Sequence, residues 1–172
     1  MDARPAHDSP ARNRRPGDGW VECACGQRHW GLHGAAGLLL ARRTASGTEV
    51  VLQHRATWSH HGSTWALPGG AVGPDETAVQ GALREAHEEA GVRGSEVDVR
   101  DAHVLDHGTW SYTTVLAVLR DGAAGAVSET DDESLEIRWV ALDDVASRPL
   151  LPAFAAAWPE LRSRVEQLVA PA

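Results

Sequence analysis

Several residue types are scarce or missing in this chain of 172 residues, and each absence excludes a class of protein. There is no lysine, so all 16 positive side chains are arginines, and 24 acidic residues leave a formal net charge of −8. A protein that binds the backbone of a nucleic acid polymer needs a basic face, which this composition does not favour. The two cysteines are too few for a disulfide scaffold.

Long hydrophobic segments are also missing. No apolar run approaches the ~18 residues of a membrane-spanning helix, and the first 18 residues hold no apolar stretch typical of a secretory signal. We therefore expect a cytoplasmic protein with no membrane partner. Residues 1–18, rich in arginine and proline, are expected to form a flexible polar tail, and residues 19–172 to form a single domain.

What remains is a pattern of strands and helices. Residues 35–41 and 50–52 are expected to pair as a hairpin across the turn at Ser46-Gly47, and Thr57 to Gly70 is expected to be a loop. Further strands are expected at 97–104, 112–119 and 135–141. Helices are expected at 75–90 and 151–169, the second kinked or divided in two at Pro159. This order predicts an α/β (α+β) fold in which a mixed β-sheet is sandwiched between helices.

The first of these helices carries an unusual concentration of acid. At 100° per residue, Glu85, Glu88 and Glu89 fall on one side of it, where like charges repel and where the negative end of the helix dipole disfavours carboxylates. No lysine is interleaved among them. A bound Mg²⁺ or Mn²⁺ would offset this repulsion, and a solvated acidic face is the alternative. The preceding Gly69-Gly70 pair would let backbone approach the same ion.

Residues 70–92 have the form G-x5-E-x7-R-E-U-x-E-E-x-G-U, where U is aliphatic, with Ala86 small but permitted at one aliphatic position. This run resembles the signature of the Nudix (MutT-type) hydrolases at every fixed position. The resemblance implies a Nudix fold and hydrolysis of a nucleoside diphosphate linked to another group, with a divalent metal.

The resemblance also implies a role for each matched residue, and these are expectations. Glu88 and Glu89 should ligate metal, Glu85 should ligate it or orient the attacking water, and the carbonyl of Gly69 should be a further ligand. Glu76 and Arg84 should pair to hold the loop against the helix, with Gly70 and Gly91 making the turns at either end.

Residues outside the signature are expected to complete the site. Family members often recruit a general base from a later loop, and in the acidic run 130–136 we favour Glu133, with Glu136 second. Trp58, Trp110 and Tyr112 are candidates for stacking a nucleobase, although packing beneath a loop is the alternative for each aromatic ring.

Several substrates and activities remain open. Similarity to actinobacterial MutT-like proteins favours a (d)NTP or an oxidised purine NTP, cleaved to a nucleoside monophosphate and pyrophosphate. ADP-ribose and dinucleoside polyphosphates are alternatives, as is a non-catalytic nucleotide sensor. An isopentenyl diphosphate isomerase would need a catalytic cysteine in a later sheet context, whereas Cys23 and Cys25 both fall in the first hairpin.

Two further features carry weaker expectations. Cys23, Cys25, His29 and His33 are residue types that bind zinc, but C-x-C is tighter than the usual knuckle. Family members with zinc modules carry two C-x-x-C pairs, so idle, reduced thiols are the favoured interpretation. The C-terminal helix is expected to pack on the sheet, with a homodimer contact left open.

Overall fold

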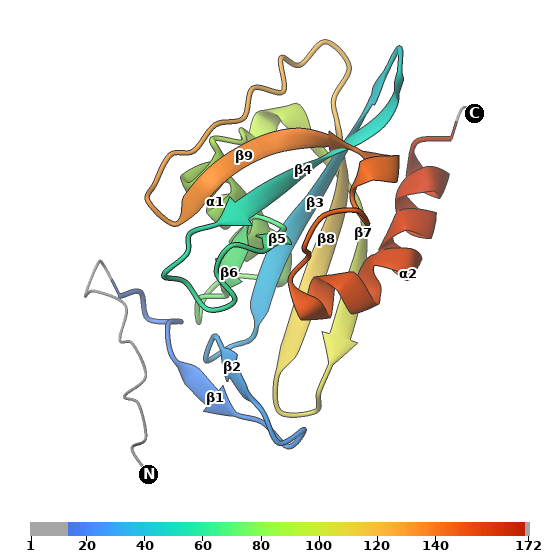
Figure 1. Ribbon diagram of the computed structural model, residues 1–172. Helices are drawn as coiled ribbons and strands as arrows, with labels where there is room; N and C mark the ends of the chain where they lie inside the picture. The colour runs from blue at the N-terminus through green and yellow to red at the C-terminus, as the bar shows by residue number, and fades with distance from the viewer. Residues whose placement is uncertain (1–13, 171–172) are drawn as a thin grey trace.

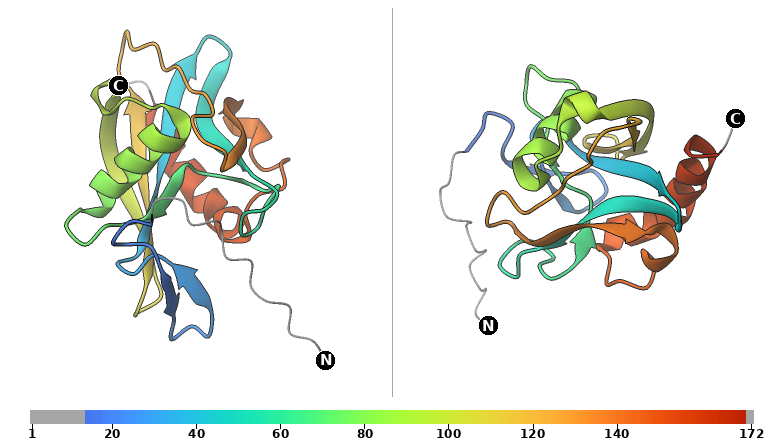
Figure 2. Two further views of the ribbon diagram at one scale, coloured as in Figure 1. Left: turned by 90° about the vertical axis from the view of Figure 1, so that its left-hand side faces the viewer. Right: turned by 90° about the horizontal axis from the view of Figure 1, so that it is seen from above.

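A mixed β-sheet with one long helix on each face forms the body of the protein (Figures 1 and 2). The computed structural model describes residues 14–170. Seven strands form the main sheet, in the order β5-β4-β3-β8-β7, with β6 also paired to β3 and β9 to β4. Among the described residues, no helix is long and apolar enough to cross a membrane.

The elements follow one another with short connections. Two strands form a separate hairpin, β1 (Trp20–Glu22) and β2 (Arg28–Trp30). The strands of the main sheet are β3 (Ala35–Thr44), β4 (Gly47–Arg55), β5 (Trp65–Ala66), β6 (Gly69–Ala71), β7 (Val97–Asp106), β8 (Ser111–Leu119) and β9 (Ser134–Ala141). The helices are α1 (Ala78–Ala90) and α2 (Pro152–Leu168), with 3₁₀ turns at Gly94–Glu96 and Leu142–Asp144.

The sheet divides between β3 and β4. Near the hairpin turn the two strands pair with each other, from Ala41↔Val50 to Thr44↔Gly47. At its other end β3 pairs instead with β6, through Gly37↔Gly69, and β4 pairs along its length with β9. A Cβ on Gly69 would collide with the backbone of β3, so only glycine allows β6 to approach this closely.

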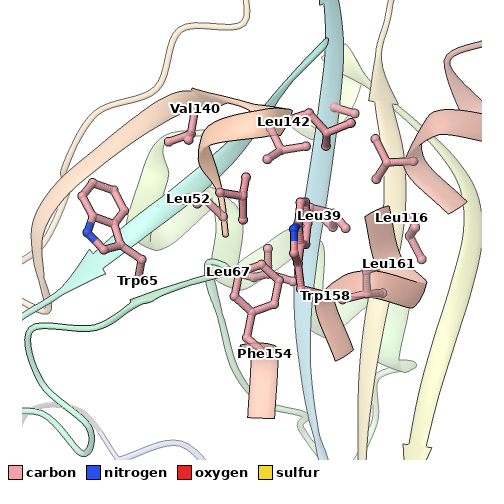
Figure 3. Close-up of a cluster of buried hydrophobic side chains, with 14 residues drawn as sticks. Leu39, Leu52, Trp65, Leu67, Leu116, Val140, Leu142, Phe154, Trp158 and Leu161 are labelled. Atoms are coloured by element: carbon pink, nitrogen blue, oxygen red, sulfur yellow. The ribbon is translucent and has the colours of Figure 1, made fainter. Parts of the chain in front are cut away.

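Two hydrophobic cores lie on opposite faces of the sheet, because successive strand residues point to opposite sides. On β3, Leu38 and Leu40 face α1, whereas Leu39 faces α2. The core beneath α2 is lined by the helix residues Phe154, Trp158, Leu161 and Val165 (Figure 3). The apolar face of α2 therefore packs on the sheet, as the sequence predicts.

Local capping sets the bounds of α1. The side chain of Thr77 accepts a hydrogen bond from the backbone N–H of Gln80, whose side chain in turn accepts one from the Thr77 N–H. The helix ends at Gly91, which adopts the left-handed conformation at φ 69°. It begins at Ala78 and not at Asp75, because Thr77 takes the capping position.

The structure corrects three of the expected segments. The C-terminal helix continues through Pro159 as a single helix, so the expected division in two is wrong. Buried residues on both sides of the proline hold it to the sheet. The expected loop at 57–70 contains β5 and most of β6, because backbone pairing with β4 and β3 orders it.

The expected tail at 1–18 needs a partial correction. Residues 1–13 lie outside the described part of the chain, but residues 15–18 lie against the domain. The Leu32 N–H donates to the Gly17 carbonyl at 2.9 Å, and Arg15 forms an ion pair with Glu88. Backbone pairing and charge together hold this segment in place.

The core beneath α2 generates a prediction of stability. Leu161 is 1% exposed, so Leu161→Ala should lower the free energy of unfolding by about 2–5 kcal/mol, from lost burial and the cavity left behind. Leu135, which is 50% exposed, is the matched control, and Leu135→Ala should change stability by less than about 0.5 kcal/mol. Urea unfolding measures both. Equal losses in the two variants would contradict this account of the core.

Candidate active site

The loop before α1 is held to the helix by a half-buried ion pair. The Arg84 guanidinium donates to both carboxylate oxygens of Glu76, at 2.5 and 3.1 Å, and also to the Ala71 carbonyl at 3.0 Å. Glu76 accepts a further hydrogen bond from the Gly73 N–H at 2.7 Å. These contacts, led by the hydrogen bond from Arg84, lower the pKa of Glu76 and keep it ionised. The pair joins the two ends of the loop as the sequence motif predicts.

Glu85 lies between Arg84 and the glycine strand β6. Its carboxylate accepts a hydrogen bond from Arg84 at 2.5 Å. A Cβ built on Gly70 would lie 2.8 Å from the Glu85 carboxyl carbon, closer than real side chains approach. Burial raises the pKa of Glu85, against the opposing effect of Arg84. Glycine at position 70 therefore leaves the space that this carboxylate occupies.

Glu89 is the most deeply placed carboxylate of the three. It is 4% exposed, and one oxygen accepts a hydrogen bond from the Gly69 N–H at 2.9 Å. Burial raises its pKa well above the usual value, and the charge of Glu85 adds to this effect. A buried carboxylate with a single backbone donor is costly unless a cation accompanies it.

The loop before β9 brings two more carboxylates to Glu89. One oxygen each from Glu89, Asp131 and Glu133 lie within 4.8 Å of one another. The Thr130 N–H donates to the Glu89 carbonyl at 3.2 Å and the Ala56 N–H to the Glu133 carbonyl at 2.8 Å, so backbone contacts hold this loop at both ends. Partial loss of water raises the pKa of Glu133, and the neighbouring Asp131 raises it further.

Glu88 lies apart from this cluster and is held by arginines. Arg15 donates to one of its oxygens at 2.5 Å, and Arg84 lies 3.6 Å from the other. The three helix carboxylates thus have different partners: a backbone N–H for Glu89, Arg84 for Glu85, and mainly Arg15 for Glu88. The sequence pattern places them on one side of the helix but does not distinguish these environments.

These residues fit a hard divalent cation. All of the donors are carboxylate oxygens, which Mg²⁺ and Mn²⁺ prefer. Within the described part of the chain, no arginine forms a hydrogen bond or ion pair with Glu89, Asp131 or Glu133. Glu85 and Glu88 adjoin it on the same helix. The raised pKa values of Glu85, Glu89 and Glu133 show that the site favours added positive charge, from protons or from metal.

The aromatic residues expected to bind substrate lie in three different settings. Trp58 is 47% exposed in the loop between β4 and β5. Trp110 stacks on His29 at 4.1 Å between ring centroids and donates its indole N–H to the Trp30 carbonyl. Tyr112 lies in the sheet near Glu89, and burial together with that charge raises its pKa. Their roles in stacking a nucleobase stay predictions.

The two candidates for the general base are also separated. Glu133 faces Glu89, whereas Glu136 lies on β9 with its carboxylate 3.0 Å from Arg138.

Sequence reasoning did not single out three residues at this site. Asp131 joins the acidic cluster, and its place in the acidic run 130–136 was a signal that could have found it. Arg55, at the end of β4, lies close enough to Glu133 and Tyr112 for its charge to oppose the rise in their pKa values. Gln53 is 1% exposed and donates to the Ser134 hydroxyl at 2.9 Å, while its carbonyl oxygen has no protein partner. Nothing in the local sequence marks Gln53 or Arg55, because strand pairing brings them here.

Comparison with known proteins agrees with this fold and site. Residues 31–161 match the family described as the NUDIX domain. Because this match spans most of the chain, the protein belongs to the Nudix hydrolase family, an enzyme family that typically uses a divalent metal and acts on nucleotide substrates.

Close relatives occur among actinobacterial proteins. The chain is 49% identical over 163 residues to the "Nucleoside triphosphate pyrophosphatase/Nudix hydrolase fusion protein" of Bifidobacterium longum, covering 92% of this chain but only 34% of that protein. It is 46% identical over 168 residues to the "Putative 8-oxo-dGTP diphosphatase 3" of Mycobacterium tuberculosis, covering 92% of this chain and 74% of that one.

Solved structures show the same fold. The crystal structure of the Nudix hydrolase RenU from M. smegmatis has a TM-score of 0.81 and 45% identity, covering 91% of this chain and 99% of that one. A C. elegans Ap4A hydrolase complex has a TM-score of 0.63 at 24% identity, covering 77% and 98%, which shows likeness of fold alone.

The space at Gly70 generates a prediction about activity. Gly70→Ala should displace the Glu85 carboxylate and lower kcat/KM for nucleotide hydrolysis by roughly 10²-fold, since small misplacements of catalytic groups have large effects. Gly94→Ala is the control, because no atom lies within 4 Å of its added Cβ. Steady-state kinetics and circular dichroism on both variants check this. Full activity in Gly70→Ala would contradict the crowding seen here.

The burial of Glu89 generates a prediction about pH. Its raised pKa means that the folded, chelator-treated protein holds a proton that the unfolded chain releases, so wild-type stability should fall as pH rises above the ordinary glutamate value. Glu89→Gln keeps an acceptor for the Gly69 N–H and removes this effect. Its stability relative to wild type should therefore increase with pH, by up to about 1.4 kcal/mol per pH unit in the window between the two pKa values.

Guanidinium unfolding with chelator present, between about pH 5 and about pH 7.5, measures this difference. Parallel stability curves for the two proteins would show that Glu89 ionises as freely in the fold as in water.

Proposed function

We propose that this protein hydrolyses a nucleoside triphosphate, a (d)NTP or an oxidised purine NTP, to the nucleoside monophosphate and pyrophosphate, with Mg²⁺ or Mn²⁺. The observation that carries the proposal is the convergence of Glu89 with the loop carboxylates Asp131 and Glu133, on a helix that also carries Glu85 and Glu88. The names of the Bifidobacterium and Mycobacterium relatives support the substrate class.

The residues that would hold the metal are Glu85, Glu88 and Glu89, with the Gly69 carbonyl. Proximity to Glu89 supports Asp131 as a further ligand. When bound, a divalent cation neutralises phosphate oxygens and lowers the pKa of coordinated water. Arg84 positions the Glu85 carboxylate by a hydrogen bond, and the Glu76–Arg84 pair holds the loop against the helix.

Glu133 is the group proposed to take the proton from the attacking water. The raised pKa of Glu133 lies closer to neutral pH, and a general base works best when its pKa is near the operating pH. The Glu133 carboxylate also lies close to those of Glu89 and Asp131. Water oxygen forms the new bond to phosphorus, the bridging P–O bond breaks, and pyrophosphate leaves with the electron pair of that bond. Arg55, whose charge acts on Glu133, would supply positive charge for the phosphate chain.

Alternative activities have less support in this structure. A non-catalytic nucleotide sensor has no need of the carboxylates that cluster around the buried Glu89. Hydrolysis of ADP-ribose or of dinucleoside polyphosphates would use the same carboxylates, and the assay below separates these substrates. The isomerase is disfavoured because Cys23 and Cys25 lie in the β1–β2 hairpin, next to His107 and not in the acidic cluster.

Product analysis tests the proposal directly. The protein is incubated with Mg²⁺ and a panel of (d)NTPs, 8-oxo-dGTP, ADP-ribose and diadenosine polyphosphates in ¹⁸O-water, and products are identified by phosphorus NMR. We expect a nucleoside triphosphate to give a nucleoside monophosphate and pyrophosphate. Only one of these two products should carry ¹⁸O from the water. Turnover of ADP-ribose or diadenosine polyphosphates alone would contradict the proposed substrate, and tight binding without turnover would support the sensor instead.

A pair of variants tests the proton acceptor. Glu133→Gln should lower kcat by about 10²–10⁴-fold with little change in KM, because general base catalysis contributes that much. Glu136→Gln is the control, because it removes one negative charge from the same segment but from a residue that is paired with Arg138. It should leave kcat within a few-fold of wild type. A larger loss in Glu136→Gln than in Glu133→Gln would reverse the assignment.

A further inference from the structure

A second group of metal-binding residue types lies outside the carboxylate site. Cys23, Cys25 and His29 come from the β1–β2 hairpin, and His107 comes from the turn between β7 and β8. One sulfur or nitrogen atom from each of these four side chains lies within 4.8 Å of all the others. The hairpin and the turn lie side by side at one end of the sheet (Figure 1).

The fourth residue differs from the one suggested by the sequence. His33, which follows His29 at a spacing typical of zinc ligands, is exposed and lies outside the group. His107 takes its place, although it is distant in the sequence. The fold therefore brings His107 to the three hairpin residues as the fourth candidate ligand.

The separations suit a single small ion. The Cys25 sulfur lies 3.1 Å from His29 Nε2, and the rings of His29 and His107 lie 4.8 Å apart, edge to face. In a tetrahedral zinc site with two sulfur and two nitrogen ligands, ligand atoms lie about 3.3–3.8 Å from one another. Small rotations of these side chains would bring all four atoms to bonding distance from a common centre.

The unmet bonding capacity of His107 is an independent sign of a ligand. Its Nδ1 atom is buried and has no hydrogen-bond partner in the described part of the protein. Buried polar atoms almost always have a partner, and those that do not require an explanation. Coordination of a metal ion through Nδ1 would satisfy this nitrogen.

The surrounding residues hold the group in place. Trp110 stacks on the His29 ring and is itself anchored by its indole N–H to the Trp30 carbonyl. The Thr109 hydroxyl donates to the Cys23 sulfur at 3.4 Å and accepts from the Ala24 N–H at 3.2 Å. Contacts of this kind orient the ligands of metal sites.

The ionisation of the ligands is also favourable. Hydrogen bonds from the Cys25 backbone and from Thr109 lower the pKa of Cys23, which favours the thiolate. Burial and the neighbouring His107 lower the pKa of His29, which favours the neutral imidazole. These are the forms that bind metal.

We propose that Cys23, Cys25, His29 and His107 bind one Zn²⁺ ion as a structural site. Binding releases one proton from each thiol, and the two thiolates balance the charge of the ion. Four protein ligands leave no open position, so the site fastens the hairpin to the β7–β8 turn and takes no part in hydrolysis. Sulfur and imidazole donors select zinc here, whereas oxygen donors select Mg²⁺ or Mn²⁺ at Glu89.

Metal stoichiometry tests the proposal on the full chain. Protein stripped with chelator under reducing, anaerobic conditions is given Zn²⁺, desalted and analysed by plasma mass spectrometry. Co²⁺ is added to a second sample, where thiolate ligands give a charge-transfer absorption and tetrahedral geometry gives intense visible bands. We expect one zinc per chain in the wild type and both cobalt signatures.

Matched variants identify the ligands. Cys25→Ser and His107→Ala should each weaken zinc binding by roughly tenfold or more. Even changes to residues that only hydrogen-bond to metal ligands have effects of this size. His33→Ala should retain zinc, and so should Glu89→Gln, which separates this site from the carboxylates. Cys25 is exposed, so its variant is expected to fold, and circular dichroism verifies this.

Four results would overturn the proposal. In the first, the wild type binds no more zinc than Cys25→Ser does. In the second, His33→Ala loses as much zinc as His107→Ala, and in the third, Glu89→Gln loses zinc whereas Cys25→Ser retains it. In the fourth, a Cys23–Cys25 disulfide forms in place of zinc binding. Zinc is scored independently of activity, so failure of nucleotide hydrolysis would not affect the outcome.

Discussion

The repulsion among carboxylates gathered at one side of α1 is the constraint on which the rest of the structure depends. Glu85, Glu88 and Glu89 lie on the last turns of the helix, and Asp131 and Glu133 are brought against them by a loop. The fold neutralises part of this charge with arginines and buries part of it, which raises the pKa of the buried groups. Such an arrangement is unfavourable for stability alone, and the proposed binding of divalent cations would offset the repulsion.

The division of the sheet provides the space for this site. Because β3 leaves β4 to pair with β6, the backbone of Gly69 reaches Glu89 and the absence of a side chain on Gly70 leaves room for Glu85. The same division lets β9 pair with β4, which carries the acidic loop to the other side of the site. Packing of α1 and α2 on opposite faces then makes the whole arrangement rigid.

Local features of the site could be predicted from the sequence, because they depend on spacing along one helix. Helical periodicity places the three glutamates together, the Nudix motif pairs Glu76 with Arg84, and Gly91 marks the helix end. Features that depend on contacts between distant segments could not be predicted in this way. The position of Arg55 beside Glu133 follows from strand pairing, for which the local sequence carries no signal.

Two of the three errors in the expected fold have related causes. Proline disfavours a helix interior, but buried side chains on both sides of Pro159 outweigh that local preference. Charge and proline content suggested a free tail, yet residues 15–18 are held by Glu88 and by Leu32. His107 shows the same limit at the hairpin, since His33 is nearer in sequence and farther in space.

Location of the divalent ion tests the central claim most directly. Crystals grown with saturating Mn²⁺ and measured at a wavelength where manganese scatters anomalously report the position of the ion without reference to activity. The account predicts an anomalous peak bonded to Glu89 and to at least one of Glu85 and Glu88. Ordered carboxylates at these positions, with no peak between them, would contradict it.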